Sequence, residues 1–349
     1  MTTDEQYMWR CLQLADYGDG YVAPNPKVGA VLVYQDEIIG EGFHRKYGEP
    51  HAEPNAINSV KIKELISEST LYVNLEPCSH YGKTPPCADL IVRSGIPRVV
   101  IGTLDPNPKV SGRGIEILEK AGVVVISGVL ENECRELNKR FFTYQEKKRP
   151  YIILKWAQTS DGFIDIIRKD NSVTPLKISN SVTSQLTHKY RSENQSILVG
   201  SNTVLLDNPS LTVRNWSGKS PDRIILNRAG NIPPEYNIFD VSANTIIFTS
   251  NPGENTQHAS YIKIDFAKEN LKDLIQRIYN LGIHSVLVEG GAKVLNSFIE
   301  AGLWDEANVE VSQQTCGNGV KAPEIKTQPV NFKLYDNHRW ILYKNSQNP

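Results

Sequence analysis

Short apolar runs of strand length alternate with helical patterns along most of the chain, and one charged segment divides this alternation into two halves. The segment is Glu-Lys-Lys-Arg-Pro at 146–150, and a new apolar run begins directly after it at 151–156. Because 349 residues exceed what one ordinary core holds, we expect two domains, covering 1–146 and 147–349.

Strands interleaved with helices predict α/β domains, with a three-layer α/β sandwich in the first half. There we expect helices at 5–17, from 53 onward, and at 88–94, 115–121 and 131–145, with strands at 28–33, 37–43, 71–75, 98–102 and 123–126. In the second half we expect helices at 270–281 and 292–301, and strands at 151–156, 196–200, 223–227, 245–249, 285–289, 307–312, 333–335 and 340–343. The strand at 196–200 should lead into a polar loop that reaches Arg214.

His51-Ala52-Glu53, followed by Pro77-Cys78 and Cys87, is the strongest chemical signal in the sequence. One imidazole and two thiolates suit Zn²⁺, and three protein ligands leave a fourth position for water. Zinc lowers the pKa of that water, and Glu53 can face it without binding the metal. The order H-x-E and then P-C…C is typical of zinc deaminases, although here eight residues rather than two separate the cysteines.

Other interpretations of these residues remain open at this point. Taken singly, each cysteine or histidine is more typical of a packed core. A closed structural zinc site would need a fourth ligand, for which His80 is a candidate at a less natural spacing. Cys11, Cys134 and Cys316 have no partner at ligand spacing, and we expect them to be packing residues.

Charge and composition exclude several classes of protein. The formal net charge of -1 gives no long-range attraction for nucleic acid or an anionic membrane. No apolar run approaches the ~20 residues of a membrane helix, the acidic start does not resemble a secretory signal, and five cysteines are too few for a disulfide framework. We therefore expect a cytoplasmic protein without nucleic-acid or membrane partners.

The second half carries weaker signals. A strand ends at Glu289-Gly290-Gly291 and a helix follows, so the backbone N–H groups there could cradle a phosphate. The GxGxxG fingerprint is absent, and a glycine pair in this position is often simple turn chemistry. Asp207 and Arg214 could bind a sugar and a phosphate, or could form a surface ion pair.

Together these motifs resemble one family, the bifunctional deaminase–reductases of riboflavin biosynthesis, over essentially the whole chain. The resemblance rests on Pro24-Asn25-Pro26-Lys27-Val28-Gly29, Gly42-Phe43-His44, His51-Ala52-Glu53, the run from Glu76 to Cys87, and Asp105-Pro106-Asn107-Pro108. It implies a cytidine-deaminase-like α/β/α domain followed by a dihydrofolate-reductase-like α/β domain. The eight-residue spacing of the cysteines is similar to this family's own version of the motif.

For the domain at 1–146, the resemblance implies one Zn²⁺ held by His51, Cys78 and Cys87, with Glu53 as the catalytic proton shuttle. A pocket for a pyrimidinone bearing ribose 5-phosphate is implied to include Asn25, His44, Lys83, Asp105 and Asn107. Amide groups suit a pyrimidine edge, and lysine or histidine suits a phosphate or ribose. Without the resemblance, Asn107 could be a turn residue between prolines and His44 a surface residue.

For the domain at 147–349, the resemblance implies an NADPH-dependent reductase. The implied cofactor contacts are Gln158, Thr203, Asp207, Arg228 (at the 2′-phosphate), Gly291, Ala292, Lys293, Val294, Leu295, Asn296 and Ser297. The implied substrate contacts are Lys155, Arg191, Leu211, Arg214 and Glu289. The chain departs from the family where Lys177-Ile178-Ser179-Asn180 replaces an aromatic residue before Ile-Thr, after a long polar loop at 166–176.

The leading hypothesis is hydrolytic deamination of 2,5-diamino-6-(5-phosphoribosylamino)pyrimidin-4(3H)-one, followed by NADPH reduction of the ribosyl group of 5-amino-6-(5-phosphoribosylamino)uracil to ribityl. The expected partners are small molecules, and the resemblance alone implies a homo-oligomer, a dimer or tetramer. One alternative is a nucleic-acid or nucleoside deaminase with an unrelated appendage, which charge neutrality disfavours. Another is a zinc-stabilised binding module, in which Glu53→Gln would leave function unchanged.

Overall fold

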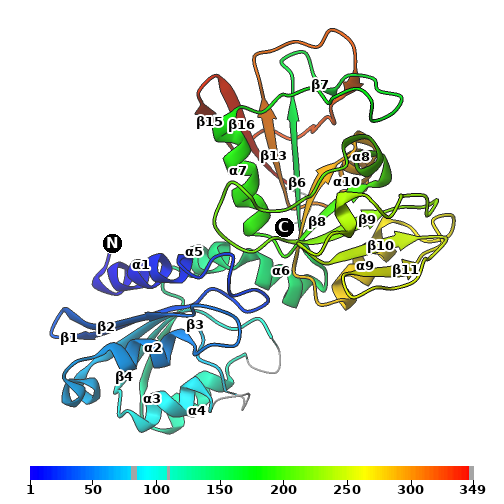
Figure 1. Cartoon of the computed structure of the whole chain (residues 1–349). Helices are drawn as coiled ribbons and strands as arrows, with labels where there is room; N and C mark the ends of the chain where they lie inside the picture. The colour runs from blue at the N-terminus through cyan, green and yellow to red at the C-terminus, as the bar shows by residue number, and fades with distance from the viewer. Residues whose placement is uncertain (80–84, 108–110, 346–349) are drawn as a thin grey trace. The chain divides into compact units, whose positions relative to one another are not determined.

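The computed structural model describes residues 1–79, 85–107 and 111–345, and the chain divides into two compact units at 1–148 and 149–349 (Figure 1). The division falls inside the charged run at 146–150. Within the described ranges, no helix has both the length and the apolar character that crossing a membrane requires.

In the described part of the chain, the first unit holds a five-stranded sheet with the order β2-β1-β3-β4-β5. Its strands are β1 (Gly29–Tyr34), β2 (Glu37–Phe43), β3 (Thr70–Leu75), β4 (Arg98–Thr103) and β5 (Val124–Ser127). β1 is antiparallel to β2 and β3, whereas β3, β4 and β5 run parallel. Side chains of a strand alternate between the two faces, so the nearly complete burial of β1, β3 and β4 matches their mainly apolar sequences, whereas the edge strands β2 and β5 are partly exposed.

Helices cover both faces of this sheet (Figure 1). They are α1 (Thr3–Asp16), α2 (Ala52–Ser59), α3 (Cys87–Arg93), α4 (Arg113–Lys120), α5 (Glu131–Leu137) and α6 (Lys139–Lys147), with a 3₁₀ turn η1 (Lys63–Glu68). Ala30 and Leu32 of β1 pack with α2, α3 and α4, whereas Val31 and Val33 pack with α1 and α5. The first unit is therefore a three-layer α/β/α sandwich, which confirms the predicted fold class.

The prediction of one helix over 131–145 was wrong. The chain leaves helical geometry at Asn138, which separates α5 from α6. The Asn138 side chain accepts a hydrogen bond from the backbone N–H of Lys27 and donates one to its carbonyl, both at 2.8 Å. These bonds to a distant segment fix the asparagine outside the helix, and the local apolar spacing carries no sign of them.

Among the described residues, the second unit holds a nine-stranded sheet with the order β11-β10-β9-β8-β12-β6-β13-β16-β15. Its strands are β6 (Tyr151–Gln158), β8 (Ser196–Gly200), β9 (Asp222–Leu226), β10 (Thr245–Thr249), β11 (Ala259–Lys263), β12 (Ser285–Gly290), β13 (Glu306–Val311), β15 (Asn331–Tyr335) and β16 (His338–Lys344). All neighbours are parallel except at β16, which is antiparallel to β13 and β15. A separate pair joins β7 (Phe163–Asp165) to β14 (Val320–Lys321).

The helices of the second unit are α7 (Ser181–Ser192), α8 (Ser201–Asp207), α9 (Leu271–Asn280) and α10 (Ala292–Glu300), with a 3₁₀ turn η2 (Asn237–Phe239). The main core joins α9 and α10 to one side of the sheet, and a second cluster holds α8 against β8, β9 and β10. The prediction of a polar loop from residue 200 to Arg214 was wrong for its first part, because residues Ser201–Asp207 form the helix α8. Val204 is fully buried there and anchors α8 to the sheet.

Candidate active sites

Three side chains from separate elements of the first unit converge on one point. His51 directly precedes α2, Cys78 follows β3, and Cys87 is the first residue of α3. The sulfurs of Cys78 and Cys87 lie 3.7 and 3.4 Å from His51 Nδ1, and the three ligand atoms lie within 4.8 Å of one another. Tetrahedral zinc with ordinary bond lengths spaces its sulfur and nitrogen ligands about 3.6 Å apart, so this donor set fits the ion.

The start of α3 favours a thiolate beside it. The backbone N–H of Cys87 donates to the Cys78 sulfur at 3.3 Å. The Cys87 thiol and the His51 ring also lower the pKa of Cys78. A helix N-terminus stabilises negative charge in this way, as the prolines before Cys87 led us to expect.

Glu53 is a buried carboxyl beside this cluster and is not one of its three ligands. Within the described residues, its Oε2 atom has no hydrogen-bond partner. Burial raises the pKa of Glu53 to about 7, and the charge of Cys78 shifts it in the same direction. A carboxyl group with a pKa near neutrality suits the acceptance and return of a proton. A purely structural zinc site would leave this unpartnered oxygen unexplained.

Asn25 and His44 form a pair next to the cluster. The His44 ring lies edge-on to His51 with 5.4 Å between centroids, and His44 is buried rather than a surface residue at the end of β2. Its Nδ1 lies 3.1 Å from the carbonyl of Pro50, which only accepts, so Nδ1 carries the proton. Its Nε2 then accepts from Asn25 Nδ2 at 3.0 Å. Burial lowers the pKa of His44, which is consistent with a neutral ring.

Asp105 and Asn107 follow β4 in a turn that Glu76 organises. The Asp105 carboxylate accepts from the backbone N–H of Asn107 at 2.8 Å, and the Glu76 carboxylate accepts from backbone N–H groups of Asp105, Gly112 and Gly114. Glu76 stands two residues before the ligand Cys78, and it therefore links the metal cluster to this turn. Glu76 is not among the site residues inferred from the sequence, although it is buried and directly follows the buried strand β3. Lys83 lies outside the described residues.

The second unit contains a cavity of about 710 Å³ at the ends of β6, β8 and β12. This volume lies in the range of small-molecule and cofactor sites. Predicted site residues that line it are Lys155, Thr203, Asp207, Glu289, Gly291, Ala292, Lys293, Val294 and Leu295. Gly291 precedes α10 with a φ of +77°, a conformation that side chains disfavour, and the first residues of α10 line the cavity.

Arg191 and Glu289 form a buried, bidentate ion pair beside this cavity. Arg191 donates to the two carboxylate oxygens of Glu289 at 2.8 and 2.7 Å, and also to the carbonyl of Thr212. The backbone N–H of Arg214 donates to His188 Nδ1 at 3.1 Å. Asp207 and Arg214 do not pair with each other in the described contacts, since Asp207 binds Arg168. Neither His188 nor Arg168 was singled out in the sequence.

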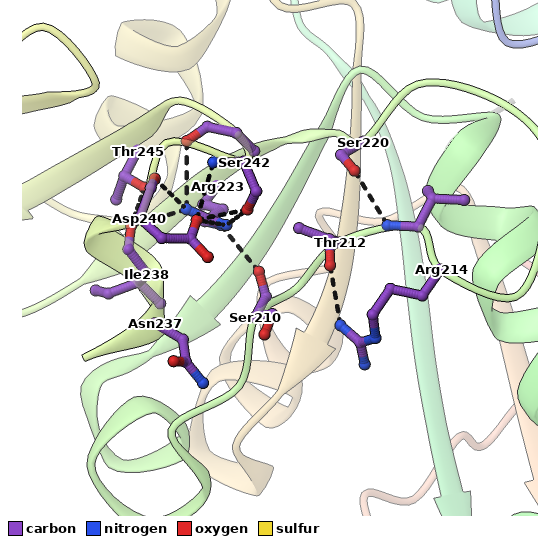
Figure 2. A network of polar contacts seen from close by, with 12 residues as sticks. Ser210, Thr212, Arg214, Ser220, Arg223, Asn237, Ile238, Asp240, Ser242 and Thr245 are labelled. Atoms are coloured by element: carbon purple, nitrogen blue, oxygen red, sulfur yellow. Dashed lines mark hydrogen bonds and ion pairs between the residues drawn. The ribbon is translucent and has the colours of Figure 1, made fainter. Parts of the chain in front are cut away.

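Figure 2 shows how the segment that carries Leu211 and Arg214 is held. Arg223 of β9 is fully buried and donates from Nε to the carbonyl of Ser210, while its Nη atoms bind the turn around Asp240. Leu211 is buried with a φ of +55°. Arg214 donates from Nη1 to the Thr212 hydroxyl. These bonds give the segment after α8 a defined course without regular secondary structure.

Several predicted contacts lie apart from the described lining of the cavity. The Gln158 side chain accepts from the indole of Trp156, and Arg228 is exposed after β9. Arg191 and Arg214 take part in the polar contacts of Glu289 and His188, whereas Leu211 packs in the hydrophobic cluster that holds α8 against β8, β9 and β10. Asn296 and Ser297 follow Leu295 in α10, and Leu295 is the last residue of that helix that lines the cavity in the described part of the chain. For these residues the assigned roles stay predictions.

Comparison with known proteins agrees with both sites. The family described as "Cytidine and deoxycytidylate deaminase zinc-binding region" matches residues 1–103, and the "RibD C-terminal domain" matches residues 150–336. "Riboflavin biosynthesis protein RibD" of Aquifex aeolicus (strain VF5) is 41% identical over 336 residues, covering 95% of this chain and 93% of that protein. RibD of Escherichia coli (strain K12) is 34% identical over 352 residues, with coverages of 95% and 93%.

Solved structures give the same result. A diaminohydroxyphosphoribosylaminopyrimidine deaminase/5-amino-6-(5-phosphoribosylamino)uracil reductase from Thermotoga maritima is 39% identical, with a TM-score of 0.88 and coverage of 98% of this chain and 99% of that one. Fold and sites together define a zinc-dependent deaminase joined to a dihydrofolate-reductase-like reductase that uses NADPH. The chain belongs to the RibD family, the bifunctional deaminase–reductases of riboflavin biosynthesis, which confirms the family inferred from its motifs.

Proposed function

We propose that this chain deaminates 2,5-diamino-6-(5-phosphoribosylamino)pyrimidin-4(3H)-one in its first unit and reduces the ribosyl group of the product in its second. The observation that carries the proposal is the combination of a three-ligand donor set with the buried Oε2 atom of Glu53, which has no hydrogen-bond partner in the part of the chain that the structure describes. Three donors suit a catalytic zinc with an open position, and a free carboxyl beside it suits proton transfer. Family membership supplies the substrate class.

In the deaminase site, His51, Cys78 and Cys87 would hold the zinc ion, which when bound would supply an activated water for attack on the ring carbon that bears the amine. Glu53 takes a proton from that water and delivers it to the departing nitrogen. Because His44 accepts from Asn25 Nδ2, the Asn25 Oδ1 atom is oriented to accept from a ring N–H or amine.

Lys83, Asp105 and Asn107 complete the deaminase pocket in our proposal. The ammonium of Lys83 would pair with the substrate phosphate. The Asp105–Asn107 turn, fixed through Glu76, would contact the ribose or the pyrimidine. Two polar side chains held in one turn by hydrogen bonds would help to orient the substrate for reaction.

In the reductase site, NADPH when bound would supply the hydride that C1′ of the ribose receives. The bond from C1′ to the ring oxygen breaks, and that oxygen must receive a proton. Lys155 is buried against the cavity, and burial lowers the pKa of its ammonium group while Glu289 and Glu310 oppose that shift. Lys155 is therefore suited to give this proton, and the Arg191 pair holds the Glu289 carboxylate next to it.

Contacts to the cofactor would come from Gln158, Thr203, Asp207 and the turn at 291–297. Thr203 packs against Gly290, and a Cβ at that glycine would meet the Thr203 side chain at 3.0 Å, so the glycine turn and α8 approach closely. Lys293 is an exposed cation in the first turn of α10 and lines the cavity, which suits a phosphate of the dinucleotide. Arg228 remains our candidate for the 2′-phosphate.

The proposal extends to a homo-oligomer, a dimer or tetramer, working in the cytoplasm on small molecules without nucleic-acid or membrane partners. Val330, Phe332 and Leu334 are 54%, 61% and 64% exposed on or beside the edge strand β15, a surface that suits association with another chain. Light scattering after size exclusion tests this. All five cysteines are free, which suits a reducing compartment.

A two-stage assay tests the function. Purified protein with zinc is incubated with the diaminopyrimidine phosphate first without and then with NADPH. We expect ammonia release in the first stage and NADPH oxidation in the second, and supplied aminouracil phosphate should be reduced without a lag. Absence of ammonia release, or oxidation of NADPH by the diamino compound before deamination, would contradict the proposal.

A further inference from the structure

The segment that departs from the family pattern forms much of one side of the cavity in the second unit. It follows β7 and ends at Asn180, the N-cap of α7. The side chains that it and β7 contribute are mainly aliphatic: Ile164, Ile166, Ile167, Pro175, Leu176 and Ile178. Lys177, which replaces the family's aromatic residue, is exposed. The side chains of this segment would therefore form the surface that a dinucleotide bound in the cavity contacts on this side.

Asp165 closes the base of this loop. One carboxylate oxygen, Oδ1, accepts from the backbone N–H groups of Ile166 and Leu176 at 2.9 and 2.8 Å. The two ends of the loop at 166–176 are therefore tied to one side chain, as in a compact Ω-loop. The other oxygen, Oδ2, binds Arg168.

Arg168 ties this closed loop to α8. Its side chain is only 2% exposed. Nε and Nη2 donate to Asp165 Oδ2 at 2.8 and 2.5 Å, and Nη2 also donates to Asp207 Oδ1 at 2.5 Å. Nη1 donates to the carbonyls of Leu206 and Val173 at 3.0 and 3.4 Å. One guanidinium therefore joins the base of the loop, its far side and the end of α8.

Charge gives this arrangement a consequence for ligand binding. Asp165 and Asp207 line the cavity, and Arg168 binds the carboxylates of both. Burial raises the pKa of Asp207, the Arg168 guanidinium lowers it, and the charge of Asp165 raises it by a smaller amount. A nicotinamide dinucleotide phosphate carries several negative charges. Two uncompensated carboxylates in the cavity wall would repel it, and because their side chains are 18% and 32% exposed, dissolved salt would weaken that repulsion.

We propose that Arg168 is a positioning residue for the nicotinamide dinucleotide, which holds the 166–176 loop as a wall of the cavity and neutralises the carboxylates of Asp165 and Asp207. This inference rests on the proposed reductase function and adds a residue to it. Arg168 acts through the loop and through Asp207. The described side-chain contacts of Arg168 are with Asp165, Val173, Leu206 and Asp207, and none is with Lys155 or Glu289, so we expect it to set cofactor affinity and to leave the chemical step unchanged.

Arg168→Met removes the charge and keeps most of the side-chain volume. In the zinc-loaded full chain we expect the Kd for NADPH, measured by its fluorescence, and the KM for NADPH to rise roughly ten- to hundredfold, the scale of losing charge-assisted hydrogen bonds. The reductase kcat at saturating NADPH and the deaminase activity of the same chain should stay at the wild-type level. Added salt should narrow the difference from wild type, because it screens the exposed carboxylates.

Lys169→Met is the matched control, since it removes the same charge from an exposed neighbour in the same loop. Arg168→Lys keeps a charge near both carboxylates and should give an intermediate KM even if the methionine variant folds poorly. Equal NADPH affinity in wild type, Arg168→Met and Lys169→Met would overturn the proposed role of Arg168 and would leave the reductase proposal standing. A wild-type protein that binds no NADPH would overturn the reductase proposal and this inference together.

Discussion

Replacing Glu76 with alanine isolates the carboxylate that organises the turn of Asp105 and Asn107. Its Oε2 atom accepts from the backbone N–H groups of Asp105 and Gly112 at 3.2 and 3.0 Å, and Oε1 accepts from Gly114 at 3.0 Å. The residue is only 3% exposed, so alanine leaves three backbone donors facing a gap. Because the turn carries two residues of the proposed pyrimidine pocket, the loss should appear in substrate binding.

The size of the effect follows from these bonds. A hydrogen bond to a charged acceptor contributes about 1.5–3 kcal/mol, which limits the three bonds to roughly 9 kcal/mol. The three bonds share one carboxylate, and water will enter the gap that alanine leaves. We therefore expect the variant to lose about 3 kcal/mol of the free energy that holds the turn in its native conformation. Since about 1.4 kcal/mol corresponds to a factor of ten, the apparent KM of the deaminase should rise by up to about a hundredfold.

Ammonia release as a function of substrate concentration measures this change. Reductase activity on supplied aminouracil phosphate serves as an internal control in the same chain, and bound zinc is measured in parallel. Glu116→Ala is the matched control, because it removes an exposed carboxylate from α4, the helix that follows the turn. An unchanged KM in Glu76→Ala would refute the reasoning, as would loss of zinc, which would place the effect at the metal ligands.

Three further predictions concern the proposed chemistry and the pH dependence of stability. Glu53→Gln should keep its zinc and lose roughly 10²–10⁴ in deamination rate, the usual scale of general acid–base catalysis, and full activity would exclude the assigned role. His51→Ala and Cys78→Ser should lose zinc and deamination while reducing supplied aminouracil phosphate, so joint loss of both activities would argue against separable sites. Burial lowers the pKa of His188, which accepts from Arg214 as a neutral ring. The unfolded imidazole therefore binds a proton first, and stability should fall as the pH drops below about 6.5. In urea unfolding between about pH 7 and about pH 5, His188→Asn keeps an acceptor without titrating and should lose less stability than wild type; an equal loss would contradict this.

The sequence was sufficient to predict the site where the functional residues lie at the ends of helices and strands that can themselves be predicted. His51 precedes a helix, Cys78 follows a strand, and Cys87 begins a helix after two prolines. Hydrophobic periodicity locates such ends, and ligand chemistry then selects the residues. For that reason the layered fold of the first unit and its metal cluster could be inferred together.

Features that depend on long-range hydrogen bonds could not be inferred in this way. Asn138 ends α5 because it binds Lys27, which lies 111 residues earlier. The segment after β8 contains many polar residues, yet Val204 anchors it as a helix. Arg168 contacts residues up to 39 positions away, and its charge alone resembled that of any surface arginine. The local spacing of apolar residues predicts whether a segment is a helix or a strand, but it does not predict the distant residues that the segment contacts.

Zinc analysis of the purified protein combined with X-ray absorption tests the central claim most directly. We expect one zinc per chain, bound by one nitrogen and two sulfur atoms from the protein and by one light oxygen neighbour. Removal of the ion should abolish ammonia release and its return should restore it. A chain without stoichiometric zinc, or a zinc ion closed by four protein ligands, would contradict the account.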